Sequence, residues 1–357
     1  MPDPAPIYLD HSATTPLRPE ARSAMLDGFA MWANPSSPHA AGRKARAALE
    51  DARERVKVAL GWDGEVIFTS GASEAAELAM SRAVGGERFV SGVEHDAVFA
   101  AAPGAPRLAV LPNGEVDQER MEALLAKASE PVVAIQWFNS ETGVQQDMGN
   151  LADCIHDAGG LLVCDLSQSA GKYHVPHDVD MAIIAAHKFG GPVGAGALLV
   201  RDYAMLGASG GQERGYRRGT ENLPGILGMA AALEACEFPY VPHELFEAMQ
   251  RLAEEVRKAG GVWIADRFEE HSSYIDAIAM PHMSGSAQLM RFDMAGIAVS
   301  QGSACSSGSM RRSHVLAAMG VEDELADRTI RMSIGWTTTV VEIERFAEVW
   351  LAMASQS

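Results

Sequence analysis

The chain has 357 residues, a formal net charge of −18, 47% hydrophobic residues and 21% charged residues. This length exceeds what one small hydrophobic core supports, and the composition is that of an ordinary globular protein, so we expect two domains. The negative charge argues against binding to nucleic acid or to an anionic membrane surface.

Targeting and redox signals indicate a cytoplasmic protein. The N-terminus lacks the pattern of a signal peptide and no run of 18 apolar residues occurs, so we expect neither secretion nor a membrane span. The cysteines follow no C-x-x-C or Cys/His metal-binding spacing; they are Cys154, Cys164, Cys236 and Cys305. We therefore expect reduced thiols and no metal site.

Up to residue 200 the chain alternates apolar runs with helical periodicity. The apolar runs predict strands at 65–68, 88–91, 131–138, 161–165 and 181–186. The helical periodicity predicts helices at 19–32, 43–60, 116–127 and 151–159, with a further helix from Glu74. This alternation predicts an α/β fold with a mainly parallel central sheet and helices on both faces.

The second part of the chain has a different pattern of predicted elements. A loop rich in glycine and arginine is expected over 207–219, and two helical patterns over 223–257 are interrupted near Pro239 and Pro242. Short strands at 275–279, 297–299 and 331–334 then alternate with helices at 288–295 and 340–352. We predict a large domain over 15–238 and a smaller α+β domain that combines 1–14 with 239–357.

Polar residues stand at the carboxyl ends of the predicted strands. In a mainly parallel sheet these ends share one edge, so we expect the side chains to converge on one pocket. The residues concerned are Ser73, His95, Ser140, Asp165, Gln168 and Lys188. Ser73 alone could equally be a plain helix N-cap, and a histidine after a strand is more often a packed structural residue.

Lys188 follows the apolar run that ends at residue 186. Partial desolvation at a strand end lowers the pKa of an amine, which suits a lysine that forms Schiff bases. The alternative is a lysine that simply emerges into water. Asp165 ends the preceding predicted strand, where a carboxylate is costly unless it is paired.

Cys305 lies among the small polar residues 302–309. Such neighbours leave a thiol accessible, unlike the common buried cysteine. The alternative is a Ser/Gly linker that happens to hold a cysteine.

Taken together, these residues resemble cysteine desulfurases of the NifS/IscS type, which are class V aminotransferase-like enzymes of the fold-type I pyridoxal-phosphate superfamily. The resemblance covers nearly the whole chain. The matching blocks are 8–10 with 13–16, 34–39, 68–74, 94–95, 165 with 168, 187–188, 210–214 with 219–220, 302–306, 313–316 and 331–335. Each block is weak alone, and their order makes the match specific.

The resemblance implies a set of residues that bind pyridoxal 5'-phosphate. Lys188 would hold the cofactor covalently, and Asp165 would pair with the pyridinium nitrogen and keep it protonated. Gln168 would hydrogen-bond the phenolic oxygen, where Ser140 also stands, and His95 would stack on the ring.

The resemblance also assigns the phosphate and the second subunit. The phosphate would be bound by Ser73, the Ala72 N–H and His187. Thr220 would reach the phosphate held by the neighbouring subunit, which implies a homodimer.

Substrate and sulfur roles follow from the same resemblance. Arg331, assisted by Asn34, would bind the α-carboxylate of L-cysteine. Lys188 would take the Cα proton, His95 would serve as a proton shuttle, and the Cys305 thiolate would attack the substrate sulfur. The products would be L-alanine and a Cys305 persulfide, passed to an acceptor such as an iron–sulfur scaffold protein.

The chain departs from the family pattern near the cofactor. Ser73 stands for the usual Thr, Ser140 for Asn and Ala185 for Ser, and 75–77 replaces a segment that contains Asn. These departures suggest that a partner subunit completes or replaces part of the site. Other readings are a selenocysteine lyase, a class V aminotransferase, and a degenerate pyridoxal-phosphate fold that serves as a binding subunit.

Overall fold

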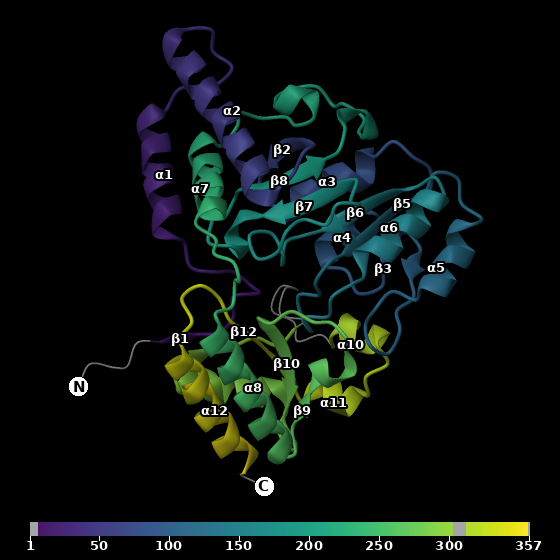
Figure 1. The fold of residues 1–357 in the computed structure, drawn as a ribbon, viewed down its shortest axis with the longest axis vertical. Helices are drawn as coiled ribbons and strands as arrows, with labels where there is room; N and C mark the ends of the chain where they lie inside the picture. Colours follow the sequence, from purple (N-terminus) through teal and green to yellow (C-terminus); the bar gives the residue numbers. More distant parts are fainter. Residues whose placement is uncertain (1–5, 303–311, 356–357) are drawn as a thin grey trace.

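The computed structural model describes residues 6–302 and 312–355. Cys305 therefore lies outside the described residues. The upper part of the molecule in Figure 1 is built on a seven-stranded sheet, and the lower part on smaller sheets flanked by helices.

The large sheet is mainly parallel, as predicted. Its strand order is β2-β8-β7-β6-β5-β3-β4, and only β8 among these strands runs antiparallel to its neighbours. The strands are β2 (Glu65–Thr69), β3 (Arg88–Ser91), β4 (Arg107–Leu108), β5 (Val132–Gln136), β6 (Leu161–Asp165), β7 (Met181–Ala185) and β8 (Gly196–Val200). The turn between β7 and β8 is short, and a parallel connection would need a crossover of a dozen residues or more.

Helices cover both faces of this sheet, again as predicted. Successive residues of a strand point to opposite faces of the sheet, and here both sets are apolar. Leu162 and Cys164 pack in the apolar cluster on one face, and Val163 packs in the cluster on the other. One face carries α1 (Pro19–Met31), α2 (Ala40–Leu60), α5 (Gln118–Leu125), α6 (Met148–Asp157) and α7 (Leu223–Glu234). The other carries α3 (Ala72–Arg82) and α4 (Asp96–Ala101).

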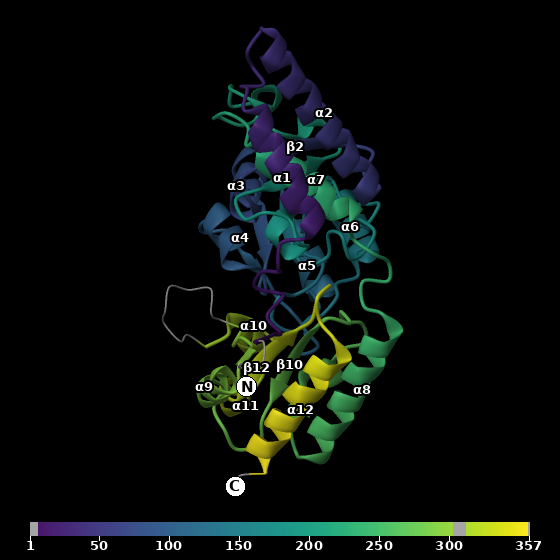
Figure 2. The same ribbon diagram turned by 90° about the vertical axis from the view of Figure 1, so that its left-hand side faces the viewer.

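The C-terminal part has its own apolar cluster. An antiparallel sheet of β9 (Val262–Trp263), β10 (Ile275–Ala279) and β12 (Thr329–Ser333) lies between two layers of helices (Figure 2). One layer holds α8 (His243–Lys258) and α12 (Val340–Ala354), and the other holds α9 (Gly285–Met294), α10 (His314–Ala318) and α11 (Asp323–Asp327). α8 buries Leu245, Met249, Leu252 and Val256 at helical spacing against this sheet, so its polar residues face outward.

The N-terminal segment packs with this C-terminal part. β1 (Ile7–Tyr8) pairs in parallel with β11 (Ile297–Ala298), and Leu9 is fully buried in the C-terminal cluster. The assignment of 1–14 to the small domain, with the limits at 14/15 and 238/239, stays a prediction.

Two local expectations differ in detail from the structure. The helix expected from Glu74 begins at Ala72, with Gly71 as N-cap, so Ser73 lies in the first turn and is not the cap. Gly71 takes φ 145°, which a residue with a side chain rarely adopts. The expected loop at 207–219 contains a short 3₁₀ turn at Glu213–Gly215. Among the described residues, no helix is long and apolar enough to cross a membrane.

Candidate active site

Lys188 stands where the polypeptide leaves the central sheet. β7 ends at Ala185, and a 3₁₀ turn over Ala186–Lys188 carries the lysine away from the strand. Its Nζ donates to the Ser12 carbonyl at 2.5 Å and to the Ala13 carbonyl at 3.0 Å. The amine therefore points to a segment that precedes α1, and the alternative of a lysine that simply emerges into water is wrong.

A cavity of about 360 Å³ lies beside this amine at the carboxyl edge of the sheet. Most residues predicted for the cofactor line it, which brings together segments far apart in the sequence. They are Ala72, Ser73, His95, Ser140, Asp165, Gln168, His187 and Lys188. The predicted convergence of strand-end residues is therefore present, and their individual roles stay predictions.

Part of the lining of this cavity offers hydrogen-bond donors to an anion. The N-terminus of α3, with Ala72 and Ser73 in its first turn, lines it, and the first N–H groups of a helix have no partner within the helix. His187 lies near, with Nδ1 3.2 Å from the Thr14 hydroxyl. Burial, together with the charge of Lys188, lowers the pKa of His187 to about 4, so this imidazole is neutral at pH 7.

The lining of this cavity also includes a carboxylate and unsatisfied polar atoms. Asp165 ends β6, and its Oδ1 accepts the Ser167 backbone N–H at 2.8 Å. Ser167 Oγ and Gln168 Oε1 are buried, and neither has a hydrogen-bond partner among the described residues. Buried polar atoms of this kind are normally satisfied. An amine, an anion cradle, a carboxylate and free polar atoms around one cavity fit pyridoxal phosphate.

Arg331 lines a second cavity of about 180 Å³, which it shares with His95, Ser140 and Lys188. This arginine lies on β12 and is 4% exposed. Its Nη2 forms an ion pair with Asp10 at 2.7 Å and its Nη1 donates to the Ser140 carbonyl at 2.9 Å. Its Nε is buried without a partner among the described residues.

Two predicted residues are not brought to either cavity. Asn34 and Thr220 are exposed, and neither lines the cavities that hold Lys188. Thr220 was predicted to act on a neighbouring subunit, so its position does not contradict that role. Cys305 lies outside the described residues.

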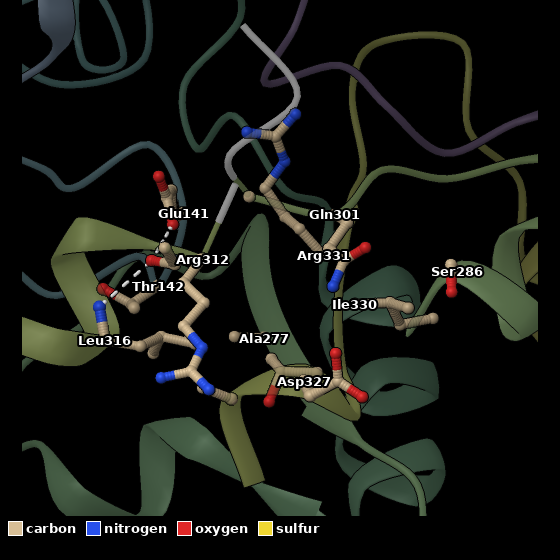
Figure 3. A pocket seen from close by; sticks show the side chains of 14 residues that line it. Glu141, Thr142, Ala277, Ser286, Gln301, Arg312, Leu316, Asp327, Ile330 and Arg331 are labelled. Carbon is tan, nitrogen blue, oxygen red and sulfur yellow. Dashed lines mark hydrogen bonds between the residues drawn. The ribbon is translucent and has the colours of Figure 1, made fainter. Parts of the chain in front are cut away.

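A third cavity of about 150 Å³ adjoins the second, and Arg331 and Glu141 line both (Figure 3). Glu141 accepts a hydrogen bond from the Ser313 hydroxyl, and Ser313 caps α10. A Cβ added to Gly302 would lie 2.3 Å from Glu141 Oε2. Glu141 therefore contacts the chain on both sides of the undescribed segment 303–311.

Sequence reasoning assigned no role to Ser12. Besides accepting from Lys188, its carbonyl accepts from Gln168 Nε2 at 3.0 Å, and its hydroxyl donates to the Ser140 carbonyl at 2.8 Å. Ser12 thus joins three predicted cofactor residues. The sequence signal that could have indicated Ser12 was its position in a polar turn directly after the short apolar run 7–9.

Comparison with known proteins places this site in a family. The class-V aminotransferase family model matches residues 7–346. A cysteine desulfurase from Cereibacter sphaeroides is 36% identical, over 96% of this chain and 94% of that protein. The cysteine desulfurase IscS of an Anaeromyxobacter species is 34% identical, over 95% of this chain and 90% of that protein.

The solved structures agree. A NifS-like protein from Rickettsia africae superimposes with a TM-score of 0.85 at 30% identity, covering 98% of this chain and 99% of that one. The fold-type I architecture predicted from the sequence is thereby confirmed, as is pyridoxal 5'-phosphate as the cofactor of the family. The chain belongs to the class-V aminotransferase family.

Proposed function

We propose that this chain is a pyridoxal-phosphate-dependent cysteine desulfurase. One observation carries the proposal: the Lys188 amine borders two cavities, one that fits the cofactor and one that contains Arg331. An amino acid whose carboxylate meets Arg331 would therefore present its Cα to Lys188. The names of the relatives support L-cysteine as that amino acid.

In this proposal different residues of the chain bind different parts of the cofactor. Pyridoxal phosphate, when bound, withdraws electrons from the substrate Cα. Asp165 would keep the ring nitrogen protonated, and Gln168 and Ser140 would serve the phenolic oxygen. Ser73, the Ala72 N–H and His187 would bind the phosphate.

The remaining residues act on the substrate. Lys188 would hold the cofactor, and its amine would take the Cα proton of the substrate. Arg331, with Asn34, binds the α-carboxylate, and His95 carries protons. The Cys305 thiolate attacks the substrate sulfur, so that an S–S bond forms as the C–S bond breaks. The products are L-alanine and a persulfide on Cys305.

The proposal includes partners. We propose a cytoplasmic homodimer, supported by three large apolar side chains that α1 and its C-cap leave exposed, namely Leu26, Phe29 and Trp32. α1 lies at the edge of the molecule in Figure 1, where a second copy has access to it. Thr220 then reaches the phosphate bound by the partner subunit. An iron–sulfur scaffold is the proposed sulfur acceptor, in keeping with the IscS name of one relative.

The test is a product assay on purified protein with L-cysteine and a reductant. Wild type should release sulfide and L-alanine in equal amounts, whereas Cys305→Ala and Lys188→Ala should release neither above background. Cys154→Ala, which changes a half-buried thiol on α6, is the matched control and should behave as wild type. Alanine formed only with a keto acid, without sulfide, would identify an aminotransferase instead. Absence of cofactor absorbance in wild type would favour the binding-subunit alternative.

A further inference from the structure

Glu94 is a fully buried carboxyl group that joins three parts of the site. It lies between β3 and α4, directly before His95, and is 0% exposed. Its Oε1 accepts the backbone N–H of Gln136, the last residue of β5. Its own backbone carbonyl lies 2.8 Å from Nε2 of His314, the first residue of α10.

Oε2 of Glu94 is buried, and it has no hydrogen-bond partner among the described residues. An ionised carboxylate in such a place costs far more than a neutral acid. The titratable groups around it are Asp165 and Cys164 of β6, together with the neighbouring His95 and His314. Lys188 and Arg331 line a cavity together with Glu94. Lys188 donates to the Ser12 and Ala13 carbonyls, however, and Arg331 pairs with Asp10.

Asp165 adds a second reason for a neutral Glu94. Gln136, whose N–H binds Glu94, is the register partner of Asp165 on the adjacent strand. Two carboxyl groups so close seldom both ionise, and the more buried one keeps its proton. Desolvation, followed by the charge of Asp165, raises the pKa of Glu94 well above its ordinary value.

We propose that Glu94 is a positioning residue of the cofactor site that acts as a neutral carboxylic acid. Through its bond to the Gln136 N–H, it attaches the turn that carries His95 to the end of β5. Because Glu94 is neutral, Asp165 would carry the negative charge offered to the ring nitrogen of a bound cofactor. The inference rests on the proposed function for the roles of Asp165 and His95. It adds a residue to which that function assigns no task.

The first test measures whether the Glu94 carboxyl group is protonated. Infrared difference spectra between wild type and Glu94→Gln at pH 7 in D₂O should contain the C=O stretch of a protonated carboxylic acid, lost in the variant. A difference in the carboxylate bands instead would overturn the proposal. Glu344→Gln, on the exposed face of α12, is the control and should change only carboxylate bands.

The second test measures how Glu94 affects the affinity for the cofactor. Apoprotein is titrated with pyridoxal phosphate at pH 7, and the Kd is obtained from absorbance. Glu94→Gln retains an acceptor for the Gln136 N–H and should bind within about twofold of wild type. Glu94→Ala leaves that N–H unsatisfied and should bind at least about tenfold more weakly. Equal affinity of wild type and Glu94→Ala, or a tenfold loss in Glu94→Gln, would contradict the proposal.

Neither measurement requires turnover. If wild type binds pyridoxal phosphate but releases no sulfide, the proposed function fails while the inference about Glu94 is still decided. If Glu94→Ala does not fold, the infrared spectrum and the affinity of Glu94→Gln remain decisive.

Discussion

Arg331 differs from the surface arginines because almost nothing of its side chain reaches water. Its guanidinium already holds Asp10 and the Ser140 carbonyl, so its orientation is fixed before a substrate arrives. Arg331→Lys keeps the charge but loses the planar pair of donors. We expect KM for L-cysteine to rise about tenfold to a hundredfold, which corresponds to one charged hydrogen bond of roughly 1.5–3 kcal/mol. Steady-state kinetics measure this change in KM. Arg345→Lys, at an exposed position of α12, is the control and should leave KM unchanged.

A KM for Arg331→Lys within twofold of wild type would remove Arg331 from the substrate site. The Kd for pyridoxal phosphate should change little in this variant, because Arg331 does not line the cavity that fits the cofactor.

Asp276 on β10 makes stability depend on pH. Desolvation raises its pKa from 3.8 to about 7, and a hydrogen bond from Trp263 opposes this only in part. Between pH 4 and 7 the folded state keeps a proton that the unfolded state has released, so the free energy of unfolding falls as the pH rises. About three pKa units correspond to a loss on the order of 4 kcal/mol by pH 8. Asp276→Asn should lack this loss.

Urea unfolding at pH 5 and pH 8 tests this expectation. The difference between the two pH values should be smaller in Asp276→Asn than in wild type. Asp293→Asn, which changes an exposed residue of α9, is the control and should leave the difference unchanged. An equal pH dependence in wild type and Asp276→Asn would show that Asp276 ionises normally in the folded protein.

Single residues were predictable where chemistry and strand position coincide. Lys188, Asp165 and His95 each follow a strand of the parallel sheet, and the sheet brings them to one cavity. Ser12 and Glu94 were not predictable, because their importance lies in contacts with distant segments. Ser12 meets Lys188 across 176 positions, and Glu94 meets Gln136 across 42.

At the scale of elements, a buried ion pair holds α2 against the middle of the glycine-rich segment 207–219. Arg53 of α2 binds Glu213 through Nη1 at 2.8 Å and Nη2 at 3.2 Å, and both residues are buried. Glu213 also accepts the Phe68 N–H of β2 at 2.9 Å. Glu213→Ala removes the buried partner of both Nη atoms and leaves Arg53 with the half-buried Glu50, whose Oε2 lies 3.1 Å from Nε. We therefore expect the free energy of unfolding to fall by about 3 kcal/mol, the lower end of the range for breaking a buried ion pair.

The same helix supplies a matched control. Arg55 binds Glu234 of α7 with two hydrogen bonds, but this pair is largely exposed. Glu234→Ala should therefore cost about 1 kcal/mol or less. Chemical denaturation compares the two variants, and similar losses would mean that burial does not decide the value of these pairs.

Elements with strong periodicity were predicted with small boundary errors. The buried strands β6 and β7 and the amphipathic helix α8 lie where apolar patterns place them. The 3₁₀ turn at Glu213–Gly215 was not predicted, because Glu213 and Arg214 both adopt positive φ. Tertiary contacts, notably the ion pair of Glu213 with Arg53, impose this conformation. No local sequence pattern predicts it.

At the scale of the whole molecule, the cavity edge is assembled from both ends of the chain. The segment after β1 supplies Ser12 and Ala13, the central sheet supplies Lys188, and β12 supplies Arg331. Sequence patterns predicted the two kinds of sheet, but the meeting of these segments depends on how the two parts pack. Asn34 and Thr220 stay outside both cavities, which directs attention to a second subunit.

If Thr220 serves the partner's cofactor, two inactive variants should restore each other. Lys188→Ala removes the amine of its own site, and Thr220→Asp places a negative charge where the proposed dimer brings the partner's phosphate. In a mixed dimer, one site combines an intact Lys188 with an intact Thr220 from the other subunit, while the other site carries both defects. Sulfide release should therefore return in the mixture, to about half the wild-type rate per mixed dimer.

Co-expression with two different affinity tags isolates the mixed dimer, and light scattering measures its mass. A control dimer joins Lys188→Ala to a Lys188→Ala, Thr220→Asp chain and should stay inactive, because no site in it has an amine. If the mixed dimer forms but stays inactive, Thr220 acts within its own subunit. If light scattering finds only monomer, the exposed apolar residues of α1 require another explanation.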